Sequence, residues 1–358
     1  MNNRGAHTIA EILSQPTVWA DTLDAALRDG LPALRALWQA RAPDQVIFTG
    51  CGSTHYLAMT GAALFQALVG APAVARPASE LALLPDLAFV PNADTLLVAV
   101  SRSGTTSETV EAVRVFRERV GGRVVTVTCD SASTLAQQAD VSLAADTAQE
   151  QSVAQTRSFS SMAVLCQALA AELSGRADPA LLGRLPGILQ GLIDAYHATA
   201  RALGEDASLE RFYFLGSGWL FGIASEAMLK MKEMSLSYSE AFHVLEFRHG
   251  PMSMVNDQTL VVGLLSDGAR RQETAVLRDM HGHGARILAL VEDDPDGALA
   301  GWAEAVVRLQ SGLPEWARAI LYLPVLQLLA YYRAMARGQN PDRPAKLEAV
   351  VSLGGRLL

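Results

Sequence analysis

Short apolar runs rich in β-branched residues alternate with segments of helical period in the first half of the chain. The strand-like runs lie at residues 45–50, 72–76, 96–100 and 123–129. Helical spacing of apolar residues marks 56–69 and 160–173, and also 17–42, where Gly30 and Pro32 divide the segment into two helices. Alternating strands and helices predict a parallel β-sheet that is flanked by helices on both faces and has right-handed crossovers.

The same order of strands returns in the second half. Residues 48–53, 96–98 and 124–130 are echoed by 214–219, 260–262 and 287–293, with an offset that drifts only from 166 to 163. Matching segments in one order indicate an internal duplication. We therefore predict an α/β protein with two tandem domains, each a parallel sheet between helical layers.

The length of 358 residues also favours two domains, since single domains usually hold about 100–150 residues. A polar run at 204–210 is the best boundary between them. We predict N-terminal helices at 1–43, a first domain at 44–203, a second domain at 204–338 and a C-terminal tail at 339–358.

Composition narrows the class of protein. Hydrophobic residues make up 50% and charged residues 18% of the chain, as in compact soluble proteins. A net charge of -8 without a Lys/Arg run argues against a nucleic-acid partner. The apolar segment 320–330 is shorter than the ~20 residues that span a bilayer, so we expect a buried helix and no membrane segment. Cys51, Cys129 and Cys166 are too dispersed for a disulfide framework or a zinc site, which fits a cytoplasmic protein.

A loop rich in hydroxyl groups follows the strand at 96–100. Its residues Ser101, Arg102, Ser103, Gly104 and Thr106 precede a helix that we expect to begin at Thr105 or Thr106, with Thr105 and Glu108 as a capping box. Free N–H groups at a helix N-terminus favour an anion, so a phosphate monoester is the expected guest. The alternative is that Ser and Gly only form the turn between a strand and a helix and bind no ligand.

A similar loop, Cys51, Gly52, Ser53 and Thr54, follows the strand at 45–50. Ligands of parallel sheets bind at the carboxyl ends of the strands, where both loops lie. The second half replaces Ser101 to Gly104 with Leu265, Ser266, Asp267 and Gly268. Because Asp267 would repel an anion, we expect only the first half to bind phosphate.

The predicted helix at 221–234 carries Glu226, Lys230 and Glu233 on one face. A solvated ion-pair ladder would have the same spacing. However, the helix is otherwise largely apolar, so we expect these charges to be partly buried, where a carboxylate can serve in proton transfer.

Residues 235–254 have neither helical nor strand period and include His249 in an Arg-His-Gly-Pro turn. A lone histidine is commonly structural, but carboxylates flank this one and suit it to donate and accept a proton. A metal site is less favoured, and His281 and His283 are expected to be exposed at a helix end.

Two further segments are candidate parts of a site. Residues 147–159 are polar and predict a surface loop that closes over a ligand. The tail contains Lys346, the only lysine after Lys232 and therefore a candidate amine nucleophile, although a surface lysine is the default interpretation.

With these residues in view, the chain resembles the tandem sugar isomerase (SIS) domain family, and within it the isomerase half of glucosamine-6-phosphate synthases. The matching motifs are Cys51 to Thr54, Ser101 to Thr106, Val153-Ala154-Gln155-Thr156-Arg157, Lys230-Met231-Lys232-Glu233, Glu246 to Pro251 and Ala345-Lys346. The Arg-His-Gly-Pro turn is also similar to galactosamine-phosphate deaminase/isomerases and fructosamine-6-phosphate deglycases.

The resemblance implies an enzyme that acts on a 6-phosphosugar and needs no cofactor. The loop at 101–106 and Thr54 would hold the phosphate, His249 would open the ring, and Lys346 would form a Schiff base. Glu233 would move a proton between C1 and C2, beside Lys230. Val153, Ala154 and Ala345 would contact the substrate.

Departures from the synthase pattern affect the expected reaction. Asn2 follows Met1, so we expect no glutaminase domain and therefore a deaminating or deglycating direction. Arg102 and Arg157 replace a glutamine and a lysine of the synthase pattern, which leaves the substrate open. A non-catalytic sugar-phosphate sensor is the alternative.

A homodimer with composite active sites is expected as well. The helices at 228–234 and 320–332 look too apolar for one chain to cover. The family resemblance implies a dimer too, with His249 reaching the neighbour's site.

Overall fold

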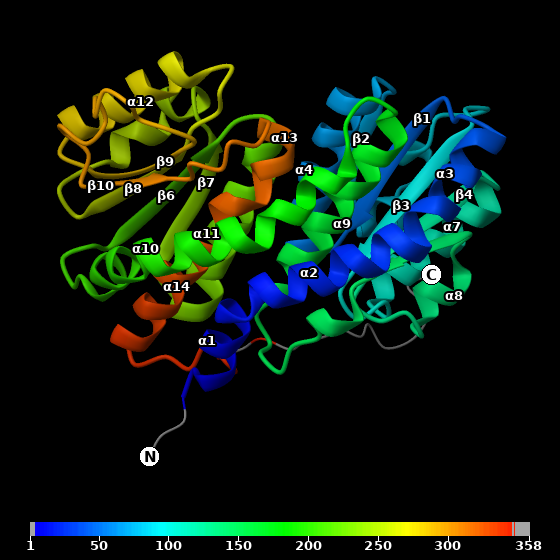
Figure 1. The fold of residues 1–358 in the computed structure, drawn as a ribbon, viewed down its shortest axis with the longest axis horizontal. Coiled ribbons are helices and arrows are strands. Elements are labelled where there is room, and N and C mark those ends of the chain that lie inside the picture. The colour runs from blue at the N-terminus through cyan, green and yellow to red at the C-terminus, as the bar shows by residue number, and fades with distance from the viewer. Residues whose placement is uncertain (1–3, 346, 348–358) are drawn as a thin grey trace. The chain divides into compact units, whose positions relative to one another are not determined.

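The computed structural model describes residues 4–345 and 347, and packing divides them into two compact units, each with one five-stranded sheet. The first unit contains residues 14–150 and 157–186, and the second contains the described residues of 1–13, 151–156 and 187–347. Figure 1 shows each sheet with its own helices. The domain boundaries expected from the sequence stay predictions.

In the first unit, every described strand pair is parallel and the order is β2-β1-β3-β4-β5. The strands are β1 (Gln45–Gly50), β2 (Ala73–Pro77), β3 (Thr95–Ser101), β4 (Arg123–Thr128) and β5 (Val141–Ala144). The helices are α2 (Gln15–Ala25), a π-helical turn (Ala26–Gly30), α3 (Leu31–Ala40), α4 (Ser53–Val69), α5 (Ala78–Leu83), α6 (Pro85–Ala88), α7 (Ser107–Arg119), α8 (Thr134–Gln138) and α9 (Arg157–Ser174), with 3-10 turns at Asp146–Ala148 and Pro179–Arg184. Side chains of α5, α7 and α8 pack on one face of the sheet, and α4 and α9 pack on the other.

The second unit repeats this plan with the order β10-β9-β8-β6-β7, again parallel throughout. Its strands are β6 (Arg211–Gly216), β7 (Tyr238–His243), β8 (Thr259–Leu264), β9 (Arg286–Val291) and β10 (Ala305–Arg308). Its helices are α1 (Ala6–Leu13), α10 (Leu185–Glu205), α11 (Trp219–Ser235), α12 (Arg270–Gly282), α13 (Glu315–Arg318) and α14 (Leu323–Ala336), with 3-10 turns at Glu246–Arg248, Pro251–Met254 and Ala319–Tyr322. Helix α12 covers one face, and α11 covers the other and packs against α14.

The predicted α/β class and duplication are confirmed, because β1, β3 and β4 match β6, β8 and β9 in place and order. Of the edge strands, β2 was predicted at 72–76, whereas β5, β7 and β10 were missed. We predicted no strand within 235–254, and this prediction was wrong. Residues Tyr238 to His243 form β7, which pairs with β6. An edge strand has one neighbour, and β7 has a single buried position, Ser239, and no continuous apolar run.

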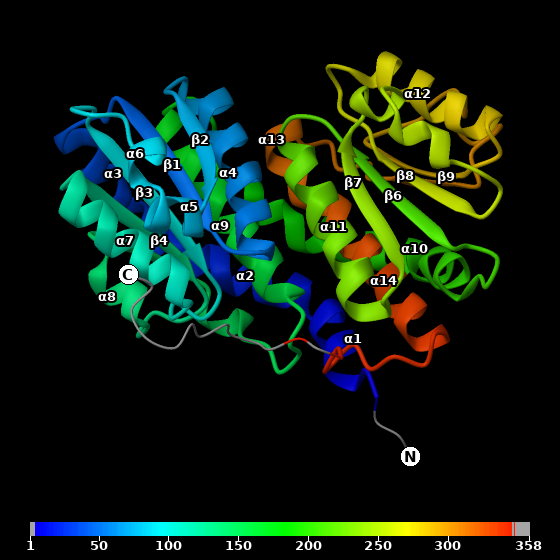
Figure 2. The same cartoon turned by 180° about the vertical axis from the view of Figure 1, so that it is seen from behind.

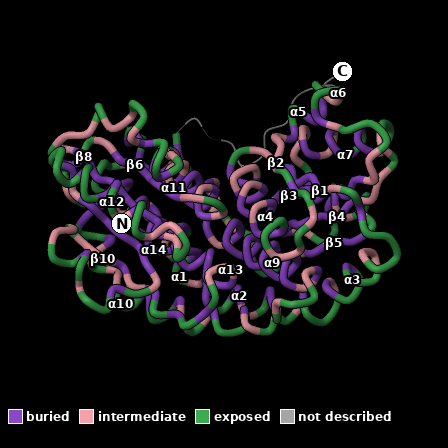
Figure 3. Tube along the Cα trace, turned by 90° about the horizontal axis from the view of Figure 1, so that it is seen from above, coloured by how far each residue is buried: buried purple, intermediate pink, exposed green. Residues whose placement is uncertain are grey.

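The apolar C-terminal helix is buried as expected. The segment Glu315–Ala336 is long and apolar enough to cross a membrane by composition, but 83% of its most apolar window is buried inside the protein. Figure 3 shows α14 as a buried trace. The sequence argument for a dimer was therefore wrong in its premise, since α11 and α14 cover each other within one unit. The dimer itself stays a prediction.

A glycine at the end of β6 permits the close approach of α11. A Cβ atom at Gly216 would lie 2.4 Å from the carbonyl oxygen of Leu220. We expect Gly216→Ala to lower the free energy of unfolding by ~1–3 kcal/mol, the range for overpacking, as measured by urea denaturation. The control is Gly191→Ala in α10, where a Cβ meets nothing within 4 Å and alanine favours the helix. Equal stability of the two variants would contradict the packing argument.

Candidate active site

The loop between β3 and α7 is organised by its own hydroxyl groups. Ser101 Oγ accepts a hydrogen bond from Gly104 N (3.1 Å) and lies 3.2 Å from Thr106 Oγ1. Ser103 Oγ accepts from both N and Oγ1 of Thr105, at 3.2 and 3.1 Å. Gly104 has φ +61°, and a Cβ there would lie 2.0 Å from Ser133 Oγ, so the loop requires glycine at this position.

The expected capping box at this helix is wrong. Helix α7 begins at Ser107, and its N-cap Thr106 makes no side-chain capping bond. The hydroxyl of Thr105 bonds to Ser103 instead, so short contacts within the loop replace the predicted cap.

A cavity of about 300 Å³ opens beside this loop. Its lining residues are Arg102, Ser103, Thr105, Cys129, Asp130, Gln149 and Glu150. The Arg102 guanidinium lies 3.8 Å from the carboxylate of Glu150, whose side chain is fully buried and accepts from Ser158 Oγ. The cavity therefore combines hydroxyl donors and one guanidinium with two carboxylates, a mixed-charge lining that can orient a polar ligand.

The second loop of the first unit lies at the same edge of the sheet. Helix α4 begins at Ser53, and Gly52 before it has φ +56°. Thr54 Oγ1 donates to Cys51 O and accepts from Cys51 N, both at 2.9 Å, which fixes the turn. Burial raises the pKa of the Cys51 thiol to about 11, so at neutral pH it is a protonated thiol and not a nucleophile.

The matching loop of the second unit already holds a carboxylate. Ser266 donates to Glu273 Oε2 from both its N (2.7 Å) and its Oγ (3.0 Å), and Glu273 is fully buried. Asp267, expected to repel an anion, is paired with Arg318. The donors of this loop are thus used internally, and phosphate binding by the first half alone stays a prediction.

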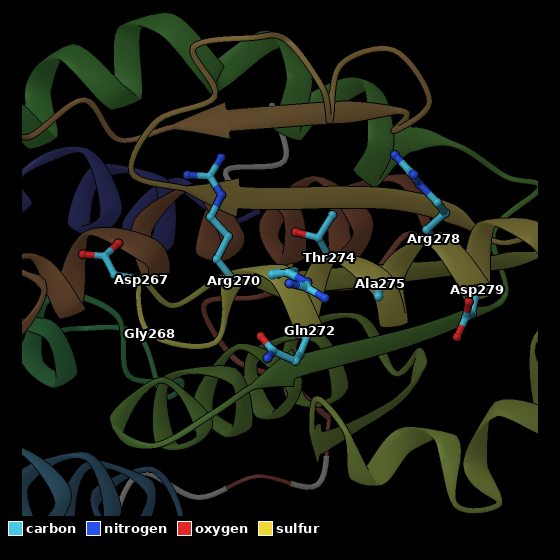
Figure 4. Close-up of a pocket in the computed structure, with 9 residues that line it drawn as sticks. Asp267, Gly268, Arg270, Gln272, Thr274, Ala275, Arg278 and Asp279 are labelled. Carbon is cyan, nitrogen blue, oxygen red and sulfur yellow. The ribbon is translucent and has the colours of Figure 1, made fainter.

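A larger cavity of about 640 Å³ lies along α12, near this second loop. Figure 4 shows that its side chains do not converge, since Arg270 and Gln272 point in opposite directions. Binding sites need polar groups aimed at a common point. We therefore give this surface no role in the chemistry.

Helix α11 brings three charged side chains together out of water. Lys230 Nζ lies 3.2 Å from Glu226 Oε1 and donates to Glu233 Oε2 at 2.6 Å. The side chain of Lys230 is 1% exposed, that of Glu226 is fully buried, and that of Glu233 is 18% exposed. A solvated ladder is excluded by this burial, and Glu233 is the member that remains accessible to a ligand.

The protonation state of Lys230 follows from this arrangement. Burial alone would lower the pKa of Lys230, but the carboxylates of Glu226 and Glu233 outweigh it, so its pKa is raised. Lys230 is therefore a permanent cation at neutral pH. It can stabilise negative charge beside Glu233, whereas a Schiff base would need a neutral amine.

His249 lies in an exposed turn of the second unit. The backbone N–H of His249 donates to Glu246 O at 3.0 Å, and Gly250 after it has φ +126°. The ring is thus presented to the outside of the unit. His281 and His283 are exposed as expected, and no cluster of three metal-ligating side chains occurs among residues 4–345.

The expected surface loop at 147–159 is largely buried instead. Ser152, Ala154 and Thr156 are each at most 3% exposed, and Val153 N donates to Asp342 O at 3.0 Å. Thr147, Gln149 and Gln151 are exposed, but the backbone N–H groups of Gln151 and Ser152 donate to the buried Glu11. Val153 and Ala154 therefore stand on a fixed loop of the second unit.

Of the tail candidates, Ala345 is exposed and Lys346 lies outside the described residues. Two carboxylates that shape the loops, Glu150 and Glu273, were not singled out from the sequence. Glu150 and its partner Ser158, and Glu273 and its partner Ser266, do not share a helical or strand period. The local sequence pattern therefore could not identify these two carboxylates.

Comparison with known proteins follows the geometry. The SIS domain profile matches residues 40–172 and 207–337. The chain belongs to the SIS domain family. This SIS protein is 32% identical, over 96% of its length, to glutamine–fructose-6-phosphate aminotransferases [isomerizing] of Symbiobacterium thermophilum and Aeropyrum pernix. It spans 58% and 57% of the length of those relatives.

Two solved structures share the fold. A glucosamine-6-phosphate deaminase from Thermotoga maritima is 28% identical with a TM-score of 0.78, covering 97% of this chain and 100% of the deaminase. A tagatose-6-phosphate ketose/aldose isomerase from Escherichia coli has a TM-score of 0.83 at 24% identity, with 93% of each chain covered. The SIS protein is thus related to a glucosamine-6-phosphate deaminase and shares its fold with a ketose/aldose isomerase.

The loop geometry predicts the effect of removing one hydroxyl. Ser103→Ala is expected to weaken the binding of glucosamine 6-phosphate by ~1–3 kcal/mol, the range for a hydrogen bond to a charged group, as measured by calorimetry. The control is Ser131→Ala, because Ser131 is exposed and does not line the cavity. Equal affinity of Ser103→Ala and the unsubstituted protein would remove Ser103 from the site.

The buried cluster predicts a stability effect. Lys230→Met leaves Glu226 buried without its cation and is expected to cost ~3–5 kcal/mol in the free energy of unfolding at pH 7. Lys232→Met is the control, since Lys232 is exposed on the same helix. Similar urea midpoints for the two variants would count against a buried cation.

Proposed function

We propose that this SIS protein is a cytoplasmic enzyme that deaminates or deglycates a phosphosugar. It would take an aminosugar 6-phosphate or a fructosamine 6-phosphate to a ketose or hexose 6-phosphate and release ammonia or an amine. The observation that carries the proposal is the buried Lys230 cation beside the accessible carboxylate of Glu233. Similarity over the whole length of a glucosamine-6-phosphate deaminase supports it.

The first unit would bind the phosphate. Ser101, Ser103 and Thr106 supply hydroxyl groups before the N-terminus of α7, whose dipole favours an anion. Arg102 adds a cation at the adjoining cavity. Thr54 and the neighbouring residues Cys51, Gly52 and Ser53 would complete the anion contacts from the other loop at the same sheet edge.

The second unit would supply the proton transfer. His249, exposed on its turn, would protonate the ring oxygen and open the sugar, and in a homodimer it would act in the neighbour's site. With an aminosugar 6-phosphate, Glu233 would move the proton from C2 to C1, and with a fructosamine 6-phosphate it would move the proton from C1 to C2. Lys230 would stabilise the negative charge that develops between these steps. Val153, Ala154 and Ala345 would line the sugar.

Release of ammonia completes the proposed reaction of an aminosugar phosphate. Proton transfer converts the open-chain 2-amino aldose into a C2 imine, and addition of water breaks the C–N bond, so aminosugar phosphate and water give ketose phosphate and ammonia. Lys346 would enter as a Schiff base at C2, with its amine replacing the substrate nitrogen. This role requires a neutral amine, which Lys230 cannot offer.

A substrate panel tests the function. Glucosamine, galactosamine and fructosamine 6-phosphates are incubated with the protein, and ammonia or amine release is measured. We expect turnover with at least one of them and a loss of 10²–10⁴-fold in kcat for Glu233→Gln, because an amide cannot accept the C2 proton.

Glu205→Gln, on the exposed end of α10, is the matched control and should retain full activity. Binding of phosphosugars without turnover would instead favour the sensor. Reduction with borohydride during turnover should also leave a sugar adduct on Lys346.

A further inference from the structure

The N-terminal helix of the second unit is capped by the tail of the same chain. Gly5 N donates to Asn340 Oδ1 at 3.2 Å, and Thr8 donates to Asp342 Oδ1 from both N and Oγ1 at 2.8 Å. The first amides of a helix have no partner within it, and a carboxylate is favourable there. Helix α1 has only eight residues, so it depends on these contacts, made 334 positions away. Figure 2 shows α1 beside the C-terminal red segment.

The same helix also holds the loop at 151–156. Glu11 Oε1 accepts from the N–H groups of Gln151 (2.6 Å) and Ser152 (3.3 Å). Thr8 Oγ1 lies 3.0 Å from Ser152 Oγ, and Asp342 O accepts from Val153 N. The loop is therefore fixed by backbone hydrogen bonds to both ends of the chain.

This network is buried and closed. Thr8, Glu11, Ser152 and Asp342 are all buried, so water cannot replace a lost partner. Removing one member of a buried network leaves other polar atoms unsatisfied, and the cost falls on the segment they held. Further along the loop, Thr156 O accepts from the buried Gln327 of α14, which anchors its other end.

The position of the network in the sequence connects it to the chemistry. The loop carries Val153 and Ala154, and the tail continues from Asp342 to Lys346 within four residues, a reach of at most about 14 Å. Asp342 thus contacts one segment that the proposed reaction uses and precedes the other by four residues. Its own carboxylate faces α1 and is buried there, which leaves it no contact with substrate.

We infer that Asp342 and Thr8 are positioning residues for catalysis, an inference that rests on the proposed function. By joining α1, the loop at 151–156 and the tail, they set the backbone of Val153 and the point from which the chain leads to Lys346. If the network had only a structural role, it would use the same hydrogen bonds. Its loss would then lower the stability of the protein without changing the activity of the folded molecules.

Hydrogen exchange tests whether the network holds the loop, in the full-length protein and without substrate. Asp342→Ala and Thr8→Val are expected to speed amide exchange at residues 151–153 at least tenfold. Thr8→Ser keeps the hydroxyl and should stay within twofold of the unsubstituted protein. Asp21→Ala, an exposed carboxylate on α2, is the matched control. Unchanged exchange in both disruptive variants overturns the inference, whatever the activity.

Activity separates positioning from stability. Below the unfolding temperature of each variant, borohydride-trapped adduct on Lys346 and kcat are expected to fall at least tenfold in Asp342→Ala and Thr8→Val. Affinity for inorganic phosphate should stay within twofold, because the other unit carries that loop.

Faster exchange with full kcat and full adduct would make the network structural only and the inference wrong. An unsubstituted protein that shows neither turnover nor adduct overturns the proposed function and the catalytic half of this inference. In that case the exchange data still decide whether the network holds the loop.

Discussion

In both sheets each described strand runs parallel to its neighbour, so every connection between paired strands must cross over and return to the same starting edge. The carboxyl ends of the strands then share one edge, where each chain segment turns from strand to helix. In the first unit this constraint gathers the loops after β1 and β3. Each of these two loops contains a glycine turn and leads into the N-terminus of a helix, α4 or α7, at this edge of the sheet.

The two copies of the fold differ in which loop and which helix carry polar and charged side chains. In the first copy the loop at 101–106 lines a cavity, and the helix positions that match Glu226, Lys230 and Glu233 are the uncharged Thr60, Leu64 and Ala67. In the second copy the helix carries the buried charges, and the matching loop is occupied by the carboxylate of Glu273. Under the proposed function, one scaffold thus supplies an anion loop in one copy and an acid–base group in the other.

Burial of Lys230 has a desolvation cost and also determines its protonation state. An ammonium group in the interior is tolerated only because Glu226 and Glu233 both contact it, and this arrangement keeps it charged. Glu226 is fully buried and serves the lysine, whereas Glu233 retains access to the surface. The cluster therefore separates a fully buried carboxylate from an accessible one, although both have the same spacing from Lys230 in the sequence to within one residue.

The sequence by itself determined the features that neighbouring residues encode. These are the apolar central strands, the duplication, the hydroxyl-rich loop at 101–106 and the shared face of Glu226, Lys230 and Glu233. Tertiary structure alone decided the edge strands β5, β7 and β10, the occupation of the second loop by Glu273 and the burial of Ser152, Ala154 and Thr156. It also decided the capping of α1 by Asp342. Period and spacing act over a few residues, whereas burial and hydrogen-bond partners depend on segments such as Thr8 and Asp342, which only folding brings into contact.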